Sequence, residues 1–139
     1  MKQVLFLNTP ELLAEHWPAA ASLLEPVVRQ AARGEFAVED LHDLAAAGKA
    51  WVAVMLSHGT PALAMVFGFV HYPRKTVLNV IALGGQDLAG AAVSFWPQFL
   101  GWAKESGVDE IEACTAPPMT RVLRNLGFSH TYDLVRRSC

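Results

Sequence analysis

Apolar residues in the first third of the chain recur at helical spacing. Residues 9–11, Thr-Pro-Glu, have the form of a helix start, with a hydroxyl cap, proline at the first position and an acid in the first turn. The apolar residues that follow form one stripe: Leu12, Leu13, Trp17, Leu23, Leu24, Val27 and Val28. Because Pro18 and Pro26 interrupt this stripe, we expect one bent helix or two short ones. Residues 39–48, acidic at the start and ending in glycine, predict a second short helix.

The pattern then changes to that of strands. Residues 50–56, 63–71 and 76–83 are apolar runs rich in β-branched and aromatic side chains. Turn-forming residues separate them at 57–61 and 72–75. The connections are short, so this part of the sequence predicts a three-stranded antiparallel meander.

Helical spacing returns in residues 88–107, where apolar side chains alternate in steps of four and three and a glycine ends the run. Pro97 lies inside this segment, and we expect it to bend the helix. Residues 109–115 form the next predicted strand, which should run parallel to the preceding one because a helix connects them. A helix over 119–126 and a last strand over 130–136 complete the predicted order.

Length and composition limit the classes of protein that this chain can be. Its 139 residues suffice for one domain, residues 1–139, of the α+β class. Because 53% of its residues are apolar and 17% are charged, the chain is neither disordered nor of low complexity. The longest apolar run, residues 61–70, is too short to cross a bilayer, and residues 1–4 do not open a signal peptide. We therefore expect a soluble, untargeted cytoplasmic protein without a membrane partner.

Charge and potential metal ligands are unevenly placed. Residues 9–48 carry seven acidic against two basic residues, whereas residues 121–139 carry four arginines against one aspartate. The basic end is too small for a nucleic-acid surface, so no nucleic-acid partner is expected. The two cysteines, Cys114 and Cys139, have no metal-binding spacing, and the five histidines are scattered. We expect no metal site and no disulfide.

Element order, length and local phrases together resemble the Gcn5-related N-acetyltransferase (GNAT) family over the whole chain. Residues 122–128, VLRNLGF, are similar to the family phrase that ends a helix in "LGF" before the last strands. The resemblance implies a mixed, mainly antiparallel sheet with a β-α-β unit, helices on both faces and an opening between two parallel strands. More narrowly, residues 51–54, 72–75 and 102–112 resemble small GNAT-like proteins encoded by tailed bacteriophages and prophages.

The resemblance also implies a site for acetyl-CoA or another acyl-CoA. In the family, a (Q/R)-x-x-G-x-(G/A) loop before the long helix holds the coenzyme pyrophosphate with backbone N–H groups, as a helix N-terminus does for anions in general. The corresponding candidates here are Gly85, Gln86, Leu88, Ala89, Gly90 and Ala91. Ala89 replaces the first glycine, and Asp87 adds a carboxylate that opposes an anion. Gly84 and Gly85 are either part of a flexible donor loop or only a turn.

Two further family positions have lost their usual side chains. Counting back from the LGF phrase, the Asn that contacts the coenzyme and the Tyr that protonates the leaving thiolate correspond to Ala116 and Leu123. The candidate proton-transfer residues are Glu112 on the predicted strand 109–115 and Tyr132 on the predicted last strand. Weaker candidates are Glu110, His71 and Tyr72. Each also has a structural interpretation: the glutamates as a solvated edge and the tyrosines as packed or core-covering side chains.

Two functions of different class follow from these features. The first is a phage-encoded protein of GNAT fold with a degenerate acyl-CoA site, which acts through contacts with a protein partner or a second copy in a virion or its assembly. The second is an acyl-CoA-dependent N-acyltransferase in the bacterial cytoplasm, in which an amine attacks the thioester directly. The missing acid and the carboxylate at residue 87 favour the first function.

Overall fold

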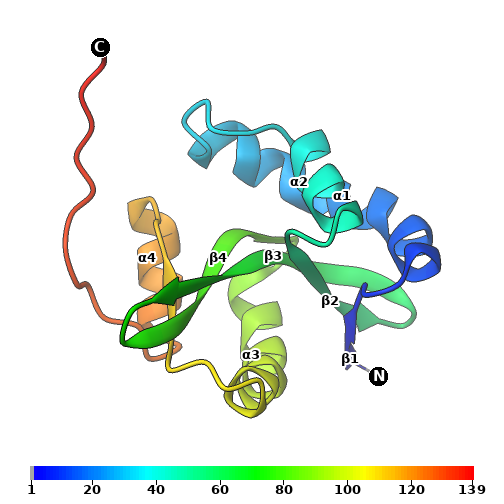
Figure 1. The fold of residues 1–139 in the computed structure, drawn as a ribbon. Coiled ribbons are helices and arrows are strands. Elements are labelled where there is room, and N and C mark those ends of the chain that lie inside the picture. The colour runs from blue at the N-terminus through cyan, green and yellow to red at the C-terminus, as the bar shows by residue number, and fades with distance from the viewer. Residues whose placement is uncertain (1) are drawn as a thin grey trace.

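One five-stranded sheet with helices on both faces organises the chain (Figure 1). The computed structural model describes residues 2–139. Its elements in chain order are β1 (Lys2–Phe6), α1 (Pro10–Ala31), α2 (Val38–Ala46), β2 (Trp51–Ser57), β3 (Thr60–Tyr72), β4 (Lys75–Gly85), α3 (Leu88–Glu105), β5 (Glu110–Ala113) and α4 (Pro117–Arg124). This architecture confirms the predicted mixed α+β class.

The strands lie in the sheet in the order in which they occur along the chain. β1 to β4 are antiparallel neighbours, and β5 pairs in parallel with β4. The predicted meander is therefore confirmed as β2, β3 and β4. The predicted parallel strand is also confirmed as β5. It runs parallel to β4 because the helical crossover α3 returns the chain to the same end of the sheet.

Each face of the sheet has its own hydrophobic core. Helices α1 and α2 bury Leu24 and Leu41 against one face, together with Val54 and Val66 of the strands. On the other face, α3 buries Phe99 against the strands. The largest fully buried side chains of this second core are Phe67, Phe95, Phe99, Met55, Leu63, Met65 and Leu78. Separate cores on the two faces follow from strands that are apolar on both sides.

Helix α1 is a single helix despite its two internal prolines. Thr9 caps it as predicted, because its Oγ1 accepts a hydrogen bond of 3.1 Å from the N–H of Leu12. Pro18, Pro26 and Pro97 of α3 all lie on exposed helix faces. A proline there leaves a carbonyl without its helical partner, and water near the surface can hydrogen-bond to it.

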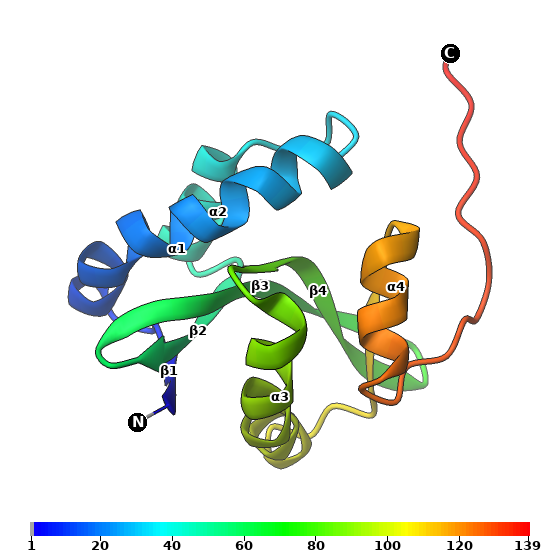
Figure 2. The same ribbon diagram turned by 180° about the vertical axis from the view of Figure 1, so that it is seen from behind.

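Two elements differ from the sequence-based prediction. Strand β1 was not predicted; it is a five-residue run that pairs with β2 and extends the sheet at that edge. The predicted last strand over residues 130–136 is wrong for the single chain, because residues 125–139 form neither helix nor strand. Figures 1 and 2 show this segment leaving α4 and running away from the sheet. Strand propensity alone does not form a strand where no neighbouring edge pairs with it.

Within residues 2–139, no helix is both long enough and apolar enough to cross a membrane.

Gly84 provides a stability test of the contact between α1 and β4. A Cβ at Gly84 would lie 2.4 Å from the carbonyl oxygen of Leu23 in α1, so Gly84→Ala forces two backbones apart. We expect the free energy of unfolding to fall by about 1–3 kcal/mol, as for other overpacked sites. Gly101→Ala, on the exposed face of α3 with open space around it, is the matched control and should stabilise by at most about 1 kcal/mol. Urea denaturation measures both; equal effects of the two substitutions contradict the contact.

Candidate functional site

Strands β4 and β5 diverge part of the way along β4. Their parallel pairing runs from Val77 opposite Glu110 to Val80 opposite Ala113, whereas β4 continues to Gly85. At the same point β4 carries a bulge, since Val66 and Phe67 of β3 pair with Ala82 and Val80 and skip Ile81. In the described chain, residues 81–85 thus have backbone groups without a strand partner on the β5 side. We call this region the β4–β5 divergence.

Helices α3 and α4 both begin at the divergence, since each follows one of the two parallel strands (Figure 2). The first N–H groups of any helix lack intrahelical partners and carry the positive end of the helix dipole. In α3 these donors belong to Leu88, Ala89 and Gly90, and no side chain caps them. In α4 the first two positions are Pro117 and Pro118, which have no N–H. Of the two helices, α3 is therefore the one that has free N–H groups at its first positions.

The Asp87 side chain lies against the first turn of α3. A Cβ placed on Gly90 would be 2.4 Å from Asp87 Oδ2, so the carboxylate occupies the space beside that glycine. The backbone oxygen of Asp87 accepts the first helical hydrogen bond, from Ala91, at 2.7 Å. A negative charge here interacts favourably with the free helix end but repels a second anion. The Asp87 carboxylate therefore lies beside the N–H donors of α3, as we expected from its position in the sequence.

The glycine pair before this loop has a packing role. Gly84 and Gly85 are the last residues of β4, and neither has a positive φ angle. Gly84 lets the carbonyl of Leu23 approach, and a Cβ on Gly85 would lie 2.9 Å from the carbonyl oxygen of Ala62. Both glycines thus lie in a strand and not in a flexible loop or a turn, and their role as N–H donors stays a prediction. Only Gln86 and Asp87 connect β4 to α3.

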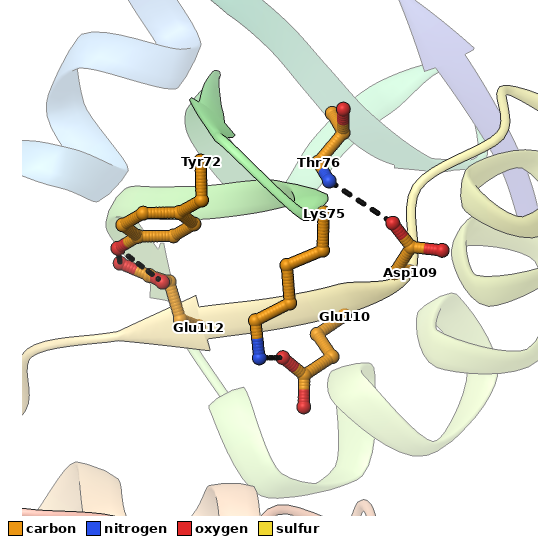
Figure 3. Close-up of polar contacts among 6 residues, drawn as sticks. All are labelled: Tyr72, Lys75, Thr76, Asp109, Glu110 and Glu112. Atoms are coloured by element: carbon orange, nitrogen blue, oxygen red, sulfur yellow. Dashed lines mark hydrogen bonds and ion pairs between the residues drawn. The ribbon is translucent and has the colours of Figure 1, made fainter.

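Glu112 of β5 belongs to a polar cluster at the tip of the β3–β4 hairpin (Figure 3). The Tyr72 hydroxyl donates to the two Glu112 carboxylate oxygens at 3.1 and 3.4 Å. Lys75 forms an ion pair with Glu110, two residues earlier on β5. The Thr76 N–H donates to Asp109 at 3.0 Å. These contacts hold the hairpin against the beginning of β5, and Glu112 lies one residue before β5 ends.

The neighbouring carboxylates shift two pKa values in this cluster. The hydrogen bond to Glu112 is the main cause that raises the pKa of Tyr72, with smaller contributions from burial and from the charges of Glu112 and Tyr132. The hydrogen bond and charge of Glu110 likewise raise the pKa of Lys75. Both groups therefore keep their protons to higher pH than usual. Tyr72 was predicted as a packed turn residue; its bond to Glu112 spans 40 residues and has no sequence signal.

Tyr132, the second candidate for proton transfer, does not lie on a strand. It is 76% exposed in the segment that follows α4, close enough for its charge to affect Tyr72 and Lys75. The prediction that Tyr132 lies on a last strand is therefore wrong for the single chain, as is the interpretation of its phenol as a core-covering side chain. His71 bonds to Thr76 at 3.2 Å within the hairpin. Glu112 and Tyr72 are thus the polar pair that the fold brings together.

The structure places the two positions that lack the family side chains at the start of α4 and within it. Ala116 is the N-cap of α4 and offers no capping side chain. Leu123 is 5% exposed in the core beneath α3. Cys114 is exposed just beyond β5, and Cys139 is exposed as well. Among residues 2–139, no group of three metal-ligating side chains comes together.

A surface hollow elsewhere has no part in the divergence. It lies between the end of α1 and the start of α2. Its lining includes Val28, Arg29, Phe36, Val38 and Glu39, and no residue of β4, β5 or α3.

Comparisons with known proteins place this geometry in a structural context. No protein-family model matches the chain, and no curated protein matches it either. Solved structures do match: a GCN5-related N-acetyltransferase from Ralstonia eutropha JMP134 is 13% identical with a TM-score of 0.72, covering 99% of each chain. A predicted acetyltransferase with acetyl-CoA from Clostridium acetobutylicum is 9% identical with a TM-score of 0.69, covering 99% of this chain and 96% of that one.

A ribosomal-protein-alanine N-acetyltransferase from Brucella melitensis biovar Abortus 2308 is similar in the same way. It is 12% identical with a TM-score of 0.70, covering 100% of this chain and 98% of that one. At such identities the likeness concerns the fold. The chain therefore has the fold of the GNAT acetyltransferases, as the sequence resemblance implies.

Tyrosine titration tests the Tyr72–Glu112 contact. Tyr72 and Tyr132 are the two tyrosines of the chain, so Tyr132→Phe lets Tyr72 be observed alone by ultraviolet absorbance. In that background, Glu112→Gln should lower the pKa of Tyr72 toward its ordinary value, because the amide carries no charge and accepts a weaker hydrogen bond.

Glu110→Gln is the matched control, because Glu110 contacts Lys75 and should leave the Tyr72 titration unchanged. Because folding favours protonated Tyr72, the contact stabilises the protein at pH values below the ordinary pKa of tyrosine. This stabilisation is lost as the pH rises through the raised pKa of Tyr72. A Tyr72 titration that Glu112→Gln does not alter contradicts the contact.

Proposed function

We propose that this protein is an acyl-CoA-dependent N-acyltransferase that binds its coenzyme at the β4–β5 divergence. The observation that carries the proposal is the coincidence of three features there: the end of β5, the unpaired backbone of residues 81–85 and the uncapped start of α3. Ligands of α/β sheets bind outside the carboxyl ends of parallel strands, where helix N-termini point at them. The presence of acetyl-CoA in a structure of the same fold supports the choice of ligand.

The chain's backbone fits such a ligand. The free N–H groups of residues 88–90 would hold the pyrophosphate. The edge of residues 81–85, which has no strand partner on the β5 side, would pair with the amide groups of the pantetheine arm, as an edge pairs with an added strand. Asp87 is the feature that opposes the fit, because its carboxylate lies beside Gly90. We expect it to weaken binding without removing the backbone donors.

Acyl transfer needs a base for the attacking amine. The coenzyme thioester supplies an activated carbonyl: the amine nitrogen forms the new C–N bond and the C–S bond breaks. Glu112, half-buried at the end of β5, would take the proton that the amine loses, and Tyr72 orients its carboxylate. Leu123 stands where the resemblance places the family's acid, so a water molecule would carry the proton from Glu112 to the thiolate.

A second candidate function rests on this missing acid and on Asp87. A chain of this fold without efficient catalysis would act through protein contacts, as a virion or assembly component. The bacteriophage origin and the location in a bacterial cytoplasm or a virion stay predictions from the sequence. The two functions differ in whether the divergence binds acyl-CoA.

Calorimetric titration with acetyl-CoA at low salt tests the proposed function. We expect the wild type to bind and Asp87→Asn to bind about two- to fivefold more tightly, the effect of removing one charge at a helix end. Glu105→Gln removes the same charge at the other end of α3 and should leave the affinity unchanged. If neither the wild type nor Asp87→Asn binds, the enzyme proposal fails and the contact function is favoured.

A further inference from the structure

Three residues of neighbouring strands form one row across the sheet: Gly68 of β3, Asn79 of β4 and Glu112 of β5. The backbone register pairs Gly68 with Asn79, and Asn79 with Glu112. Residues that are paired in this way carry their side chains on the same face of a sheet. The row lies one residue before the β4–β5 divergence, because the pairing of the two strands ends at Val80 opposite Ala113.

The row faces away from α3. The residues that precede and follow its members pack in the core beneath α3: Phe67, Phe69, Leu78, Val80, Ile111 and Ala113. Successive side chains along a strand point to opposite faces, so the row lies on the face that carries α1 and α2 (Figure 2). All three residues are half-buried, so solvent reaches this part of the face.

Gly68 leaves room beside Asn79. A Cβ on Gly68 would contact only the Ile81 Cδ1 at 3.9 Å and the Lys49 carbonyl oxygen at 4.0 Å. Both are ordinary van der Waals distances, so the space that a side chain would fill here is open. The φ angle of Gly68 is not positive, so the backbone conformation does not require glycine. The missing side chain therefore provides space, and Ile81 gives that space an apolar side.

Asn79 and Glu112 place hydrogen-bond acceptors at this space. Within residues 2–139, none of the side-chain hydrogen bonds involves the Asn79 amide. Glu112 accepts from the Tyr72 hydroxyl (Figure 3), but a carboxylate has about four acceptor sites, so others stay free. Tyr72 is neutral and leaves the negative charge of Glu112 without a cationic partner, whereas Lys75 pairs with the charge of Glu110.

We propose that this row binds the amine that the enzyme acylates, and that the substrate is a primary amine at the end of an unbranched carbon chain. A protonated primary amine has three N–H donors and one positive charge, as the lysine side chain does. The Asn79 amide oxygen and the Glu112 carboxylate accept two of these N–H groups, and Glu112 balances the charge. The carbon chain lies over Gly68, where a branch would meet Ile81 or the Lys49 carbonyl.

The position of the row agrees with the coenzyme site of the proposed function. There the pyrophosphate would be held at residues 88–90 and the pantetheine arm would run along residues 81–85, so the thioester would lie near Ile81. Asn79 is two residues from Ile81 on β4, so an amine on the row would lie next to the thioester. The chemical step therefore rests on the proposed function, whereas the binding of the amine can be tested without the coenzyme.

Nuclear magnetic resonance of the amide groups, during titration with n-butylammonium chloride, tests the binding. We expect the Gly68 backbone amide and the Asn79 side-chain amide to shift and to saturate. Tetramethylammonium chloride is the matched control, because its cation has the same charge but no N–H group, and it should cause no saturable shift at these residues. The inference is overturned if butylammonium causes no saturable shift at the row, or if tetramethylammonium causes the same one.

Two substitutions test the members of the row separately. Asn79→Leu nearly keeps the size of the side chain and removes the amide, so we expect butylammonium binding to weaken about tenfold or more, the effect of losing a hydrogen bond to a charged group. Gly68→Ala puts a methyl group where the carbon chain lies and should also weaken binding. Gly101→Ala, with open space around it on α3, should leave the affinity unchanged. Unchanged affinity in Asn79→Leu, or equal affinities of the two alanine variants, contradicts the inference.

Both positions of the row are half-buried and a Cβ at Gly68 makes ordinary contacts, so these variants should fold, which far-ultraviolet circular dichroism checks. Should one of them not fold, the comparison of the two cations on the wild type decides the question without any substitution.

Calorimetry with acetyl-CoA separates the failure of this inference from that of the proposed function. Asn79 lies outside residues 81–90, so Asn79→Leu should bind acetyl-CoA as the wild type does. Binding of butylammonium without binding of acetyl-CoA contradicts the proposed function and supports the amine site. Binding of acetyl-CoA without binding of butylammonium contradicts the inference alone.

Discussion

The parallel pairing between β4 and β5 ends at Val80 opposite Ala113, and this early end leaves room between the two strands at the starts of α3 and α4. β4 is eleven residues long and β5 is four, so the longer strand runs on without a neighbour after Val80. The bulge at Ile81 coincides with this point and turns the remaining backbone of β4. Both following helices begin at the divergence, and the prolines of α4 leave α3 as the donor of N–H groups. The coenzyme binding that we propose at this place thus needs little from side chains.

β5 is also the last strand of the sheet in residues 2–139, so the side of β5 that faces away from β4 is an open edge. A strand of four residues offers a limited ladder, and the segment over residues 130–136 remains apart from it in the single chain. The polar contacts of Tyr72 and Lys75 with Glu112 and Glu110 hold β5 to the β3–β4 hairpin instead. These side-chain contacts therefore add to the short ladder between β5 and β4 and leave the outer edge of β5 open.

Much of the fold could be predicted from periodicity and turns. The meander and the helix over Leu88–Glu105 have long, regular patterns, and the parallel strand followed from connection rules. β1 was missed because a five-residue run carries little signal. The strand over residues 130–136 was predicted from propensity, which says nothing about whether an edge is available in the same chain. The bulge at Ile81 lies inside a continuous apolar run that hides it.

The site was predictable only where it is local in sequence. Asp87 and Gly90 are three residues apart at a helix start, so their proximity could be predicted. The Tyr72–Glu112 pair joins residues 40 apart and depends on how far the hairpin tip reaches across the sheet. The role of Gly84 and Gly85 depends on the approach of α1 and β3, which the sequence does not encode locally.

Backbone nuclear magnetic resonance during titration with acetyl-CoA would locate the coenzyme on the protein. If the β4–β5 divergence binds the coenzyme, the largest amide shifts will fall on Ile81 and on residues 88–91, with little change between α1 and α2. Shifts confined to the hollow around Arg29 and Glu39, or no shifts at all, would contradict the account.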